Sequence, residues 1–216
     1  MYSIDTFGRW LATIAATALC VAVPAYAQDS SPKFELTPFA AYRGGGQFES
    51  KEGLVEFDLQ ESNAWGLILN GKVENNTQWE VLYSSQSTSV EATGEIPDEP
   101  DVSMDVEYLH VGGTYLFEGK RVRPFIAATI GASRFDPQPS GFGSETFVSG
   151  SFGGGWKISL AKNLALRIEA RGYATLVDDD SRLFCESSDA GGACLLILEG
   201  TFLTQWETRA GLTFRF

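Results

Sequence analysis

The chain has 216 residues, of which 44% are hydrophobic, and this is enough apolar content for one domain with a sizeable core. Its formal net charge is −12, and a surface this acidic repels the phosphates of nucleic acids. The glycine run at residues 153–155 lacks the Lys-Ser or Lys-Thr that follows in a phosphate-binding loop. We therefore expect no nucleic-acid partner, no cofactor and no metal centre.

The first 27 residues have the features of a secretory signal peptide. An almost wholly apolar run, residues 11–23, follows Arg9 and precedes Ala25-Tyr26-Ala27, which matches an A-x-A cleavage site. The run is shorter than the ~20 apolar residues that a membrane-spanning helix needs, and no later segment reaches that length. We expect residues 1–27 to be removed on export and residues 28–216 to form the mature domain.

From residue 34 onward, apolar and polar residues alternate with a period of two, which is the pattern of a strand with one apolar face. The expected strands are residues 34–43, 64–70, 78–86, 104–117, 122–133, 151–160, 164–176 and 201–216. Tight turns are expected at residues 71–76, 118–121 and 161–163. Loops are expected at residues 47–63 (with strand extensions), 89–103, 136–143 and from 178 onward. Linkers are thus alternately short and long.

The strand at residues 104–117 is the least regular of the eight. Leu109, Val111 and Tyr115 belong to a plausible outward set, but Val106 and Tyr108 fall on the set that also holds polar residues. A bulge would switch the phase of the alternation, so the facing of this strand is left open.

The last strand is the most regular, and it ends with Arg209, Gly211, Phe214 and Phe216 in the order polar-x-Gly-x-x-aromatic-x-aromatic. This ending resembles the C-terminal signal by which outer-membrane barrels of Gram-negative bacteria are recognised for assembly. An even number of strands, with short turns at one rim and longer loops at the other, is also typical of bacterial outer-membrane barrels. Residues 34–216 therefore resemble the small eight-stranded barrels of the OmpA-like, OmpX-like and OmpW-like kind.

The resemblance implies an all-β fold, a closed antiparallel up-and-down transmembrane barrel of about eight strands in the outer membrane of a Gram-negative bacterium. It also implies contact with outer-membrane lipid, lipopolysaccharide and the outer-membrane assembly machinery. The alternation alone equally fits a soluble β-sandwich or a periplasmic lipocalin-like carrier with an apolar interior. We prefer apolar side chains outside, because one set is mostly Leu, Ile, Ala and aromatic, whereas the other is rich in Arg, Glu and Gln.

With this polarity the charged set fills the interior. An eight-stranded barrel is just wide enough for side chains to fill, and an unpaired charge out of water is costly. We expect a structural ion-pair network, with a gated narrow path as the alternative. Its expected members are Glu35, Glu80, Arg123, Lys157, Arg167, Glu169, Arg171, Glu207 and Arg209. Aromatic side chains at the edges of the apolar band predict a girdle at the lipid interfaces. The girdle candidates are Trp65, Trp79, Tyr83, Tyr115, Trp156 and Trp206, and ordinary strand packing is the alternative for each.

Two cysteines of the mature chain, Cys185 and Cys194, flank a Gly-Gly turn. In an oxidising compartment such a pair predicts a local disulfide at a loop tip, because a metal site needs more ligands than this pair offers. Small outer-membrane barrels include enzymes that use His with Ser, Asp or Glu. The single histidine, His110, shows no triad spacing to Ser84, Ser85 or Ser87, so we do not expect catalysis.

Much of the negative charge falls in the expected long loops. Members of this set are Glu49, Glu52, Glu56, Asp58, Glu91, Glu95, Asp98, Glu99, Asp101, Asp178, Asp179 and Asp180. One interpretation is that these carboxylates form a solvated surface. The more specific alternative is that divalent cations bridge them to the phosphates of lipopolysaccharide. The expected function is a structural or surface-interaction role through these acidic loops, with an unidentified surface ligand. A narrow OmpW-like transport barrel for small solutes is the alternative.

Overall fold

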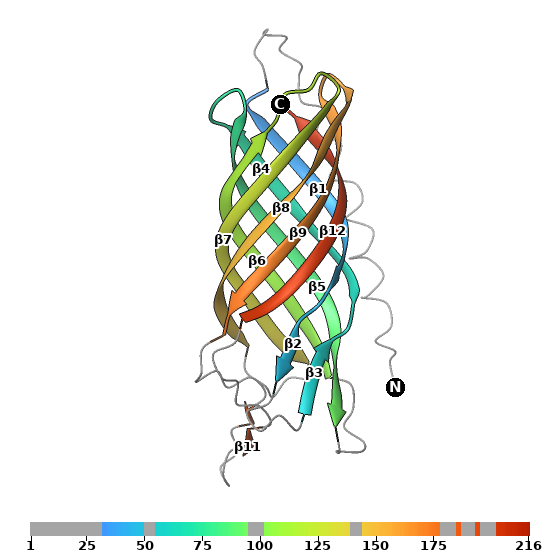
Figure 1. Cartoon of the computed structure of the whole chain (residues 1–216), viewed down its shortest axis with the longest axis vertical. Coiled ribbons are helices and arrows are strands. Elements are labelled where there is room, and N and C mark those ends of the chain that lie inside the picture. Colours follow the sequence, from blue (N-terminus) through green and yellow to red (C-terminus); the bar gives the residue numbers. More distant parts are fainter. Residues whose placement is uncertain are drawn as a thin grey trace, which may run out of the picture. The chain divides into compact units, whose positions relative to one another are not determined.

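The computed structural model describes residues 32–49, 55–94, 102–138, 144–177, 185–186, 193–194 and 202–216. In this part of the chain all regular structure is β, and Figure 1 shows the long strands wrapped into a tilted barrel. The barrel strands are β1 (Phe34–Gly44), β4 (Ser62–Lys72), β5 (Thr77–Gly94), β6 (Val102–Leu116), β7 (Val122–Gln138), β8 (Glu145–Ala161), β9 (Leu164–Leu176) and β12 (Phe202–Arg215). The predicted signal peptide, residues 1–27, lies outside the described residues and stays a prediction.

The barrel closes because the first and last strands pair. Strand β1 runs antiparallel to both β4 and β12, and β5 pairs with β6 to complete the circle. Following the partners from Phe34 around the wall leads back to Gly44, ten residues further along β1. With the usual spacings of residues and strands, this shear tilts the strands by about 40°. The prediction of a closed, antiparallel, up-and-down barrel is confirmed.

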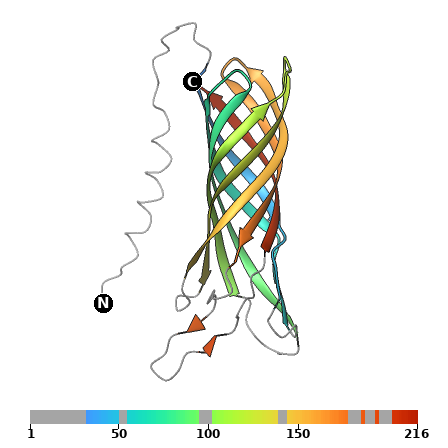
Figure 2. The same cartoon turned by 60° about the vertical axis from the view of Figure 1, so that its left-hand side comes forward.

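Both ends of the described barrel chain lie at the rim of the short turns, near the top of Figure 1. The backbone N–H groups of Lys33 and Phe34 both donate to the carbonyl oxygen of Phe216, each at 3.0 Å. The turns at this rim are residues 73–76, 117–121 and 162–163. The connections at the opposite rim include the segments that follow β1 and β9, and Figure 2 shows the small β10–β11 ladder beyond that rim.

Several strands are longer than the sequence pattern predicted. Strand β5 continues to Gly94, β6 begins at Val102 and β7 continues to Gln138, so the loops predicted at residues 89–103 and 136–143 were wrong in extent. The short strands β2 (Gln47–Glu49) and β3 (Val55–Leu59) pair with each other and agree with the strand extensions expected within residues 47–63.

The facing of β6, which the sequence left open, follows one uninterrupted alternation. Leu109, Val111 and Tyr115 are exposed on the outside, whereas Val106 and Tyr108 are buried inside. Its partners on β5 and β7 keep a constant register from end to end, so no bulge is present in β6.

The outer wall carries a continuous apolar band. It runs from Phe34 to Tyr42 along β1 and from Leu160 to Val148 along β8. The side chains of these four end residues are exposed. At the tilt above these spans correspond to about 20–30 Å of height, close to the ~25 Å band of outer-membrane barrels. Within the described residues no helix is long and apolar enough to cross a membrane. The lipid-facing polarity chosen from the sequence therefore agrees with the exposed surface.

Aromatic side chains gather at both edges of this band. At the short-turn rim Trp79 contacts Phe34 and Tyr115 contacts Phe117, with ring centroids 6.3 and 5.3 Å apart. At the other edge Trp65 packs on Tyr83 and Trp206 on Tyr42, at 5.9 and 6.0 Å. Trp156 is exposed on β8 opposite Pro124, nearer the short turns. The placement is that of a girdle, and whether these rings contact lipid stays a prediction.

The two cysteines of the long connection occupy directly opposed positions. Cys185 of β10 (Cys185–Glu186) pairs with Cys194 of β11 (Ala193–Cys194) across a two-residue ladder. Directly opposite residues of antiparallel strands have Cα atoms about 4.5–5.5 Å apart, within the range that a disulfide bridges. No disulfide is found in the described part of the chain, and the bond stays a prediction.

Candidate functional site

The interior of the barrel is the candidate site because it gathers nearly all the buried charge. Its buried charged side chains come from five strands and touch one another in three groups. The members are Glu35, Arg43, Glu80, Lys157, Arg167, Glu169, Arg171, Glu207 and Arg209. Eight of these nine were expected from the alternation, and Arg43 was not.

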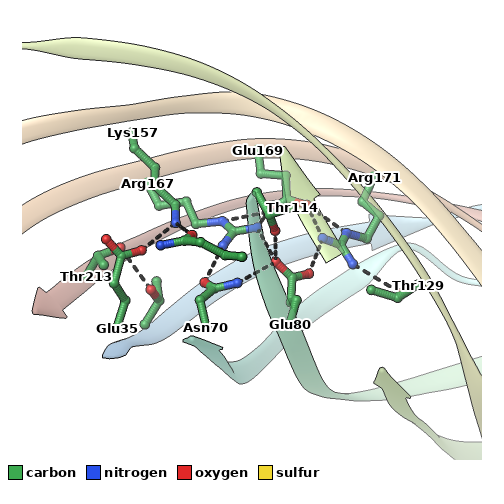
Figure 3. Close-up of polar contacts among 12 residues, drawn as sticks. Glu35, Asn70, Glu80, Thr114, Thr129, Lys157, Arg167, Glu169, Arg171 and Thr213 are labelled. Atoms are coloured by element: carbon green, nitrogen blue, oxygen red, sulfur yellow. Dashed lines mark hydrogen bonds and ion pairs between the residues drawn. The ribbon is translucent and has the colours of Figure 1, made fainter. Parts of the chain in front are cut away.

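The central group is a closed ring of two glutamates and two arginines (Figure 3). Glu80 lies 3.0 Å from Arg167 and 2.6 Å from Arg171, and Glu169 lies 2.8 and 2.6 Å from the same two guanidinium groups. Thr114 donates a further hydrogen bond to Glu80 at 2.6 Å. Each carboxylate oxygen therefore has a charged partner, and the ring is electrically balanced.

Strand register explains why these charges meet. Arg167, Glu169 and Arg171 alternate in sign along the inner face of β9, and Glu207 and Arg209 alternate on β12. The two strands pair so that Arg209 lies opposite Glu169 and Glu207 opposite Arg171. Cross-strand neighbours of opposite charge stabilise an antiparallel pair, whereas like charges destabilise it. Between β9 and β12, Glu169 and Glu207 therefore each face an arginine.

A second group closes the short-turn end. Lys157 Nζ contacts Glu35 at 2.5 Å and donates to Gln78 at 2.8 Å. The other oxygen of Glu35 receives Arg215 at 3.1 Å, and Arg215 also donates to Ser159. Arg123, expected in the network, lies instead at this rim: it donates to Asn76 and to the carbonyl of Phe117. It is only partly buried because it stands at the second position of β7, where the wall ends.

The third group lies toward the long-loop end and contains Arg43, which was not among the predicted members of the network. Arg43 donates to Glu207 through Nε at 2.8 Å and Nη2 at 2.6 Å, and its Nη2 also reaches Ser84. Its guanidinium carbon lies 4.8 Å from the ring centroid of Tyr108 and 5.3 Å from that of Tyr173. Arg209 contacts the other oxygen of Glu207 at 2.8 Å. Arg43 continues the inner set that begins at Glu35, so the alternation of β1 was a sufficient signal.

His110 lies in this region, buried and bonded only to hydroxyl groups among the contacts described. Its Nδ1 is 3.0 Å from Thr129 Oγ1 and its Nε2 is 2.8 Å from Ser149 Oγ. Thr129 in turn lies 2.6 Å from Ser151. A general base in a nucleophile–base–carboxylate arrangement needs an acidic side chain to orient it. The arrangement of His110 is therefore that of a hydrogen-bonded core residue.

Beyond this layer the interior turns apolar, which the sequence reading did not anticipate. The buried cluster at the long-loop end includes Leu59, Met104, Val106, Phe135, Phe147, Val177 and Leu203. Phe135 and Phe147 pack edge to face with centroids 5.7 Å apart. Of these residues only Leu59 falls in a predicted loop, and the others lie in or next to predicted strands. Buried charged side chains thus fill the middle of the barrel, with this apolar cluster at the long-loop end and a smaller one, Leu116, Phe125 and Ala127, near the short turns.

A closed eight-stranded barrel with a charged interior, an apolar exterior and aromatic edges defines a transmembrane β-barrel of the outer-membrane class. The comparison with known families agrees: residues 13–185 match the family described as outer membrane protein beta-barrel domain. The chain belongs to this family, and the resemblance read from its sequence is confirmed. Membership of the family implies location in the outer membrane of a Gram-negative bacterium.

Solved structures with the same fold include neisserial surface protein A and the outer membrane protein OprG from Pseudomonas aeruginosa. The first is 14% identical with a TM-score of 0.54, covering 85% of this chain and 97% of the other. The second is 12% identical with a TM-score of 0.56, covering 86% and 96%. No curated protein sequence matches the chain. At these identities the similarity establishes the fold.

Proposed function

We propose that this barrel has a structural or surface-interaction role, exercised at its long-loop end, and that it is neither a pore nor an enzyme. The observation that carries the proposal is the filled interior. The ring of Glu80, Arg167, Glu169 and Arg171 occupies the middle of the barrel with every carboxylate oxygen paired. An aqueous path would need these paired charges to separate within the wall.

The proposal predicts the electrical behaviour of the protein in planar lipid bilayers. We expect the reconstituted wild-type barrel to add no stable conductance steps above the bare bilayer, because the ion-pair layer and the apolar cap leave no continuous water column. A large porin reconstituted in the same way is the positive control for insertion and recording. Large, long-lived conductance steps from the folded barrel would contradict the structural role and favour transport.

A narrow transport barrel is the second candidate, and the apolar cap is the observation that favours it. Leu59, Phe135, Phe147 and Leu203 would offer a greasy entrance to a small apolar solute at the long-loop end. The charged layers beneath them oppose passage through the whole barrel. We therefore rank transport below the structural role.

The long-loop rim is the proposed contact surface, and its described part is acidic above the aromatic edge. Tyr42 donates to Glu61 at 2.8 Å, Tyr83 to Glu107 at 2.6 Å and Ser87 to Asp105 at 2.6 Å. Of the acidic residues expected in the long loops, Glu49, Glu56, Asp58 and Glu91 lie in strands β2, β3 and β5. The others, at positions 52, 95, 98, 99, 101 and 178–180, lie outside the described residues. We propose that this rim meets the phosphate groups of lipopolysaccharide through bridging divalent cations, since hard oxygen ligands suit Ca²⁺ and Mg²⁺.

This partner proposal predicts a dependence on calcium that requires lipopolysaccharide. In vesicles containing lipopolysaccharide, removing Ca²⁺ and Mg²⁺ with a chelator should lower the unfolding temperature of the barrel by a few degrees. In vesicles of a zwitterionic phospholipid the same treatment should leave it unchanged. The double variant Glu107→Gln with Asp105→Asn should weaken the response. Equal unfolding temperatures with and without cations in lipopolysaccharide would refute the bridge.

A further inference from the structure

Among the described residues, the interior holds one more buried positive charge than negative charge. The buried cations are Arg43, Lys157, Arg167, Arg171 and Arg209, and the buried carboxylates are Glu35, Glu80, Glu169 and Glu207. In a closed apolar wall a surplus charge is far more costly than at a surface, because water does not screen it. The position of the surplus can be found from the pairing.

The surplus lies in the group around Glu207. The central ring has two arginines for two glutamates, and the extra cation beside Glu35 is Arg215, which lies at the rim. Among the described residues, Glu207 is the carboxylate in direct contact with both Arg43 and Arg209, each almost completely buried. Glu169, across the strand pair from Arg209, is already held by the two arginines of the central ring.

The same group contains the unpaired donors of the interior. Arg209 Nη2 lies 2.8 Å from Glu207 Oε1 and donates to the hydroxyl of Tyr173 at 2.6 Å. Among the described residues, Nε and Nη1 of Arg209 have no hydrogen-bond partner, and Glu207 Oε1 accepts no hydrogen bond of good geometry. Nη1 of Arg43 is also unpaired. A buried donor left without a partner destabilises the fold, and the penalty is larger when the donor is charged. Two independent observations, the charge surplus and the free guanidinium N–H groups, thus fall on the same residues.

We propose that the interior of the barrel binds a small monovalent anion, such as chloride, at the free Nε and Nη1 edge of Arg209. The anion accepts hydrogen bonds from these N–H groups, and its charge cancels the surplus that Glu207 leaves. The Phe39 ring lies 4.6 Å from the guanidinium carbon of Arg209 and covers its face, so the ligand meets the edge of the group. This site is independent of the proposed surface role, because the anion would be held inside the barrel and would not be transported.

The test compares refolding and unfolding of the wild-type barrel in sodium chloride and in sodium gluconate at equal ionic strength. Gluconate is too bulky for the packed interior and serves as the matched salt. Once chloride exceeds its dissociation constant, the folding equilibrium constant should rise tenfold for each tenfold increase in chloride. Crystals grown with bromide should show an anomalous peak beside Nε and Nη1 of Arg209. A water molecule in that place would give neither result, and their joint absence overturns the proposal.

Variants locate the effect. Arg209→Gln removes the surplus charge and should abolish the dependence on chloride, whereas Glu207→Gln increases the surplus and should make binding tighter. Arg215→Gln, at the rim, is the control and should respond to chloride as the wild type does. If Arg209→Gln does not fold, the bromide peak of the wild type and the response of Glu207→Gln still decide. A dependence on chloride that survives Arg209→Gln would contradict the assignment.

Discussion

Replacing Glu80 with alanine should lower the free energy of unfolding by about 3–5 kcal/mol, the usual loss when one partner of a buried ion pair is removed. The substitution leaves Arg167 and Arg171 to share Glu169, and it also removes the acceptor for Asn70 and Thr114. The measurement is denaturant unfolding of the refolded barrel in detergent or lipid vesicles. The folded and unfolded fractions are read from their different migration on gels.

A double substitution distinguishes lost charge balance from lost packing. Glu80→Met combined with Arg171→Met leaves Arg167 paired with Glu169, so the central group again has equal numbers of positive and negative charges. Hydrophobic replacements of a whole buried pair are often close to neutral. We therefore expect the double variant to be more stable than Glu80→Ala. Glu107→Ala, which removes a partly exposed partner of Tyr83, should change stability by less than about 1 kcal/mol. A double variant less stable than Glu80→Ala would show that charge balance is not the deciding effect.

The second large effect is expected at Gly155, where β8 approaches β9 very closely. A Cβ atom built there would lie 1.9 Å from the carbonyl oxygen of Ile168 and 2.8 Å from the Cα of Glu169, and both of these atoms belong to the backbone. No side-chain movement relieves that overlap, so the two strands must separate and lose their hydrogen bonds. We expect Gly155→Ala to cost at least about 3 kcal/mol or to prevent assembly.

The same strand provides the control for this prediction. Gly150 faces outward, and the nearest atom to a Cβ built there is the carbonyl oxygen of Thr129 at 3.8 Å, an ordinary contact. Gly150→Ala should therefore fold like the wild type and keep its heat-modifiable migration on SDS gels. Similar stabilities for the two alanine variants would show that the close approach at Gly155 is not required.

The alternation of residue types was enough to predict the barrel and most of its inner charges. On β9 three successive inward positions and on β12 two successive inward positions are charged, and most of the outward positions between them are apolar, so both the strand and its facing are encoded locally. The same signal held for Arg43, whose place on the inner face followed directly from Glu35. The prediction that Arg123 belongs to the interior network failed for a local reason. The alternation gave its facing correctly, but the barrel wall ends at this position and leaves the side chain partly exposed.

The apolar cap could not be predicted in the same way. At the long-loop end Met104 and Phe135 point inward, whereas their neighbours Asp105 and Arg134 point outward. The apolar face is therefore the inner one there, the reverse of the rest of the wall. The ring of Glu80 with Arg167 and Arg171 depends on partners 87 and 91 residues away in the chain. Alternation gives the facing of each residue but not its height in the barrel. Height is set by the shear, which becomes known only when all the pairings are known.

The pairing of Glu35 with Arg215 joins residues 180 positions apart. A wall joined at that point has no free edge, and every strand depends on two neighbours for its backbone hydrogen bonds. Loss of any one strand would expose two unpaired edges and open the charged interior to lipid. The barrel should therefore unfold as a single cooperative unit, in contrast to repeat proteins, in which terminal units fray while the rest persists.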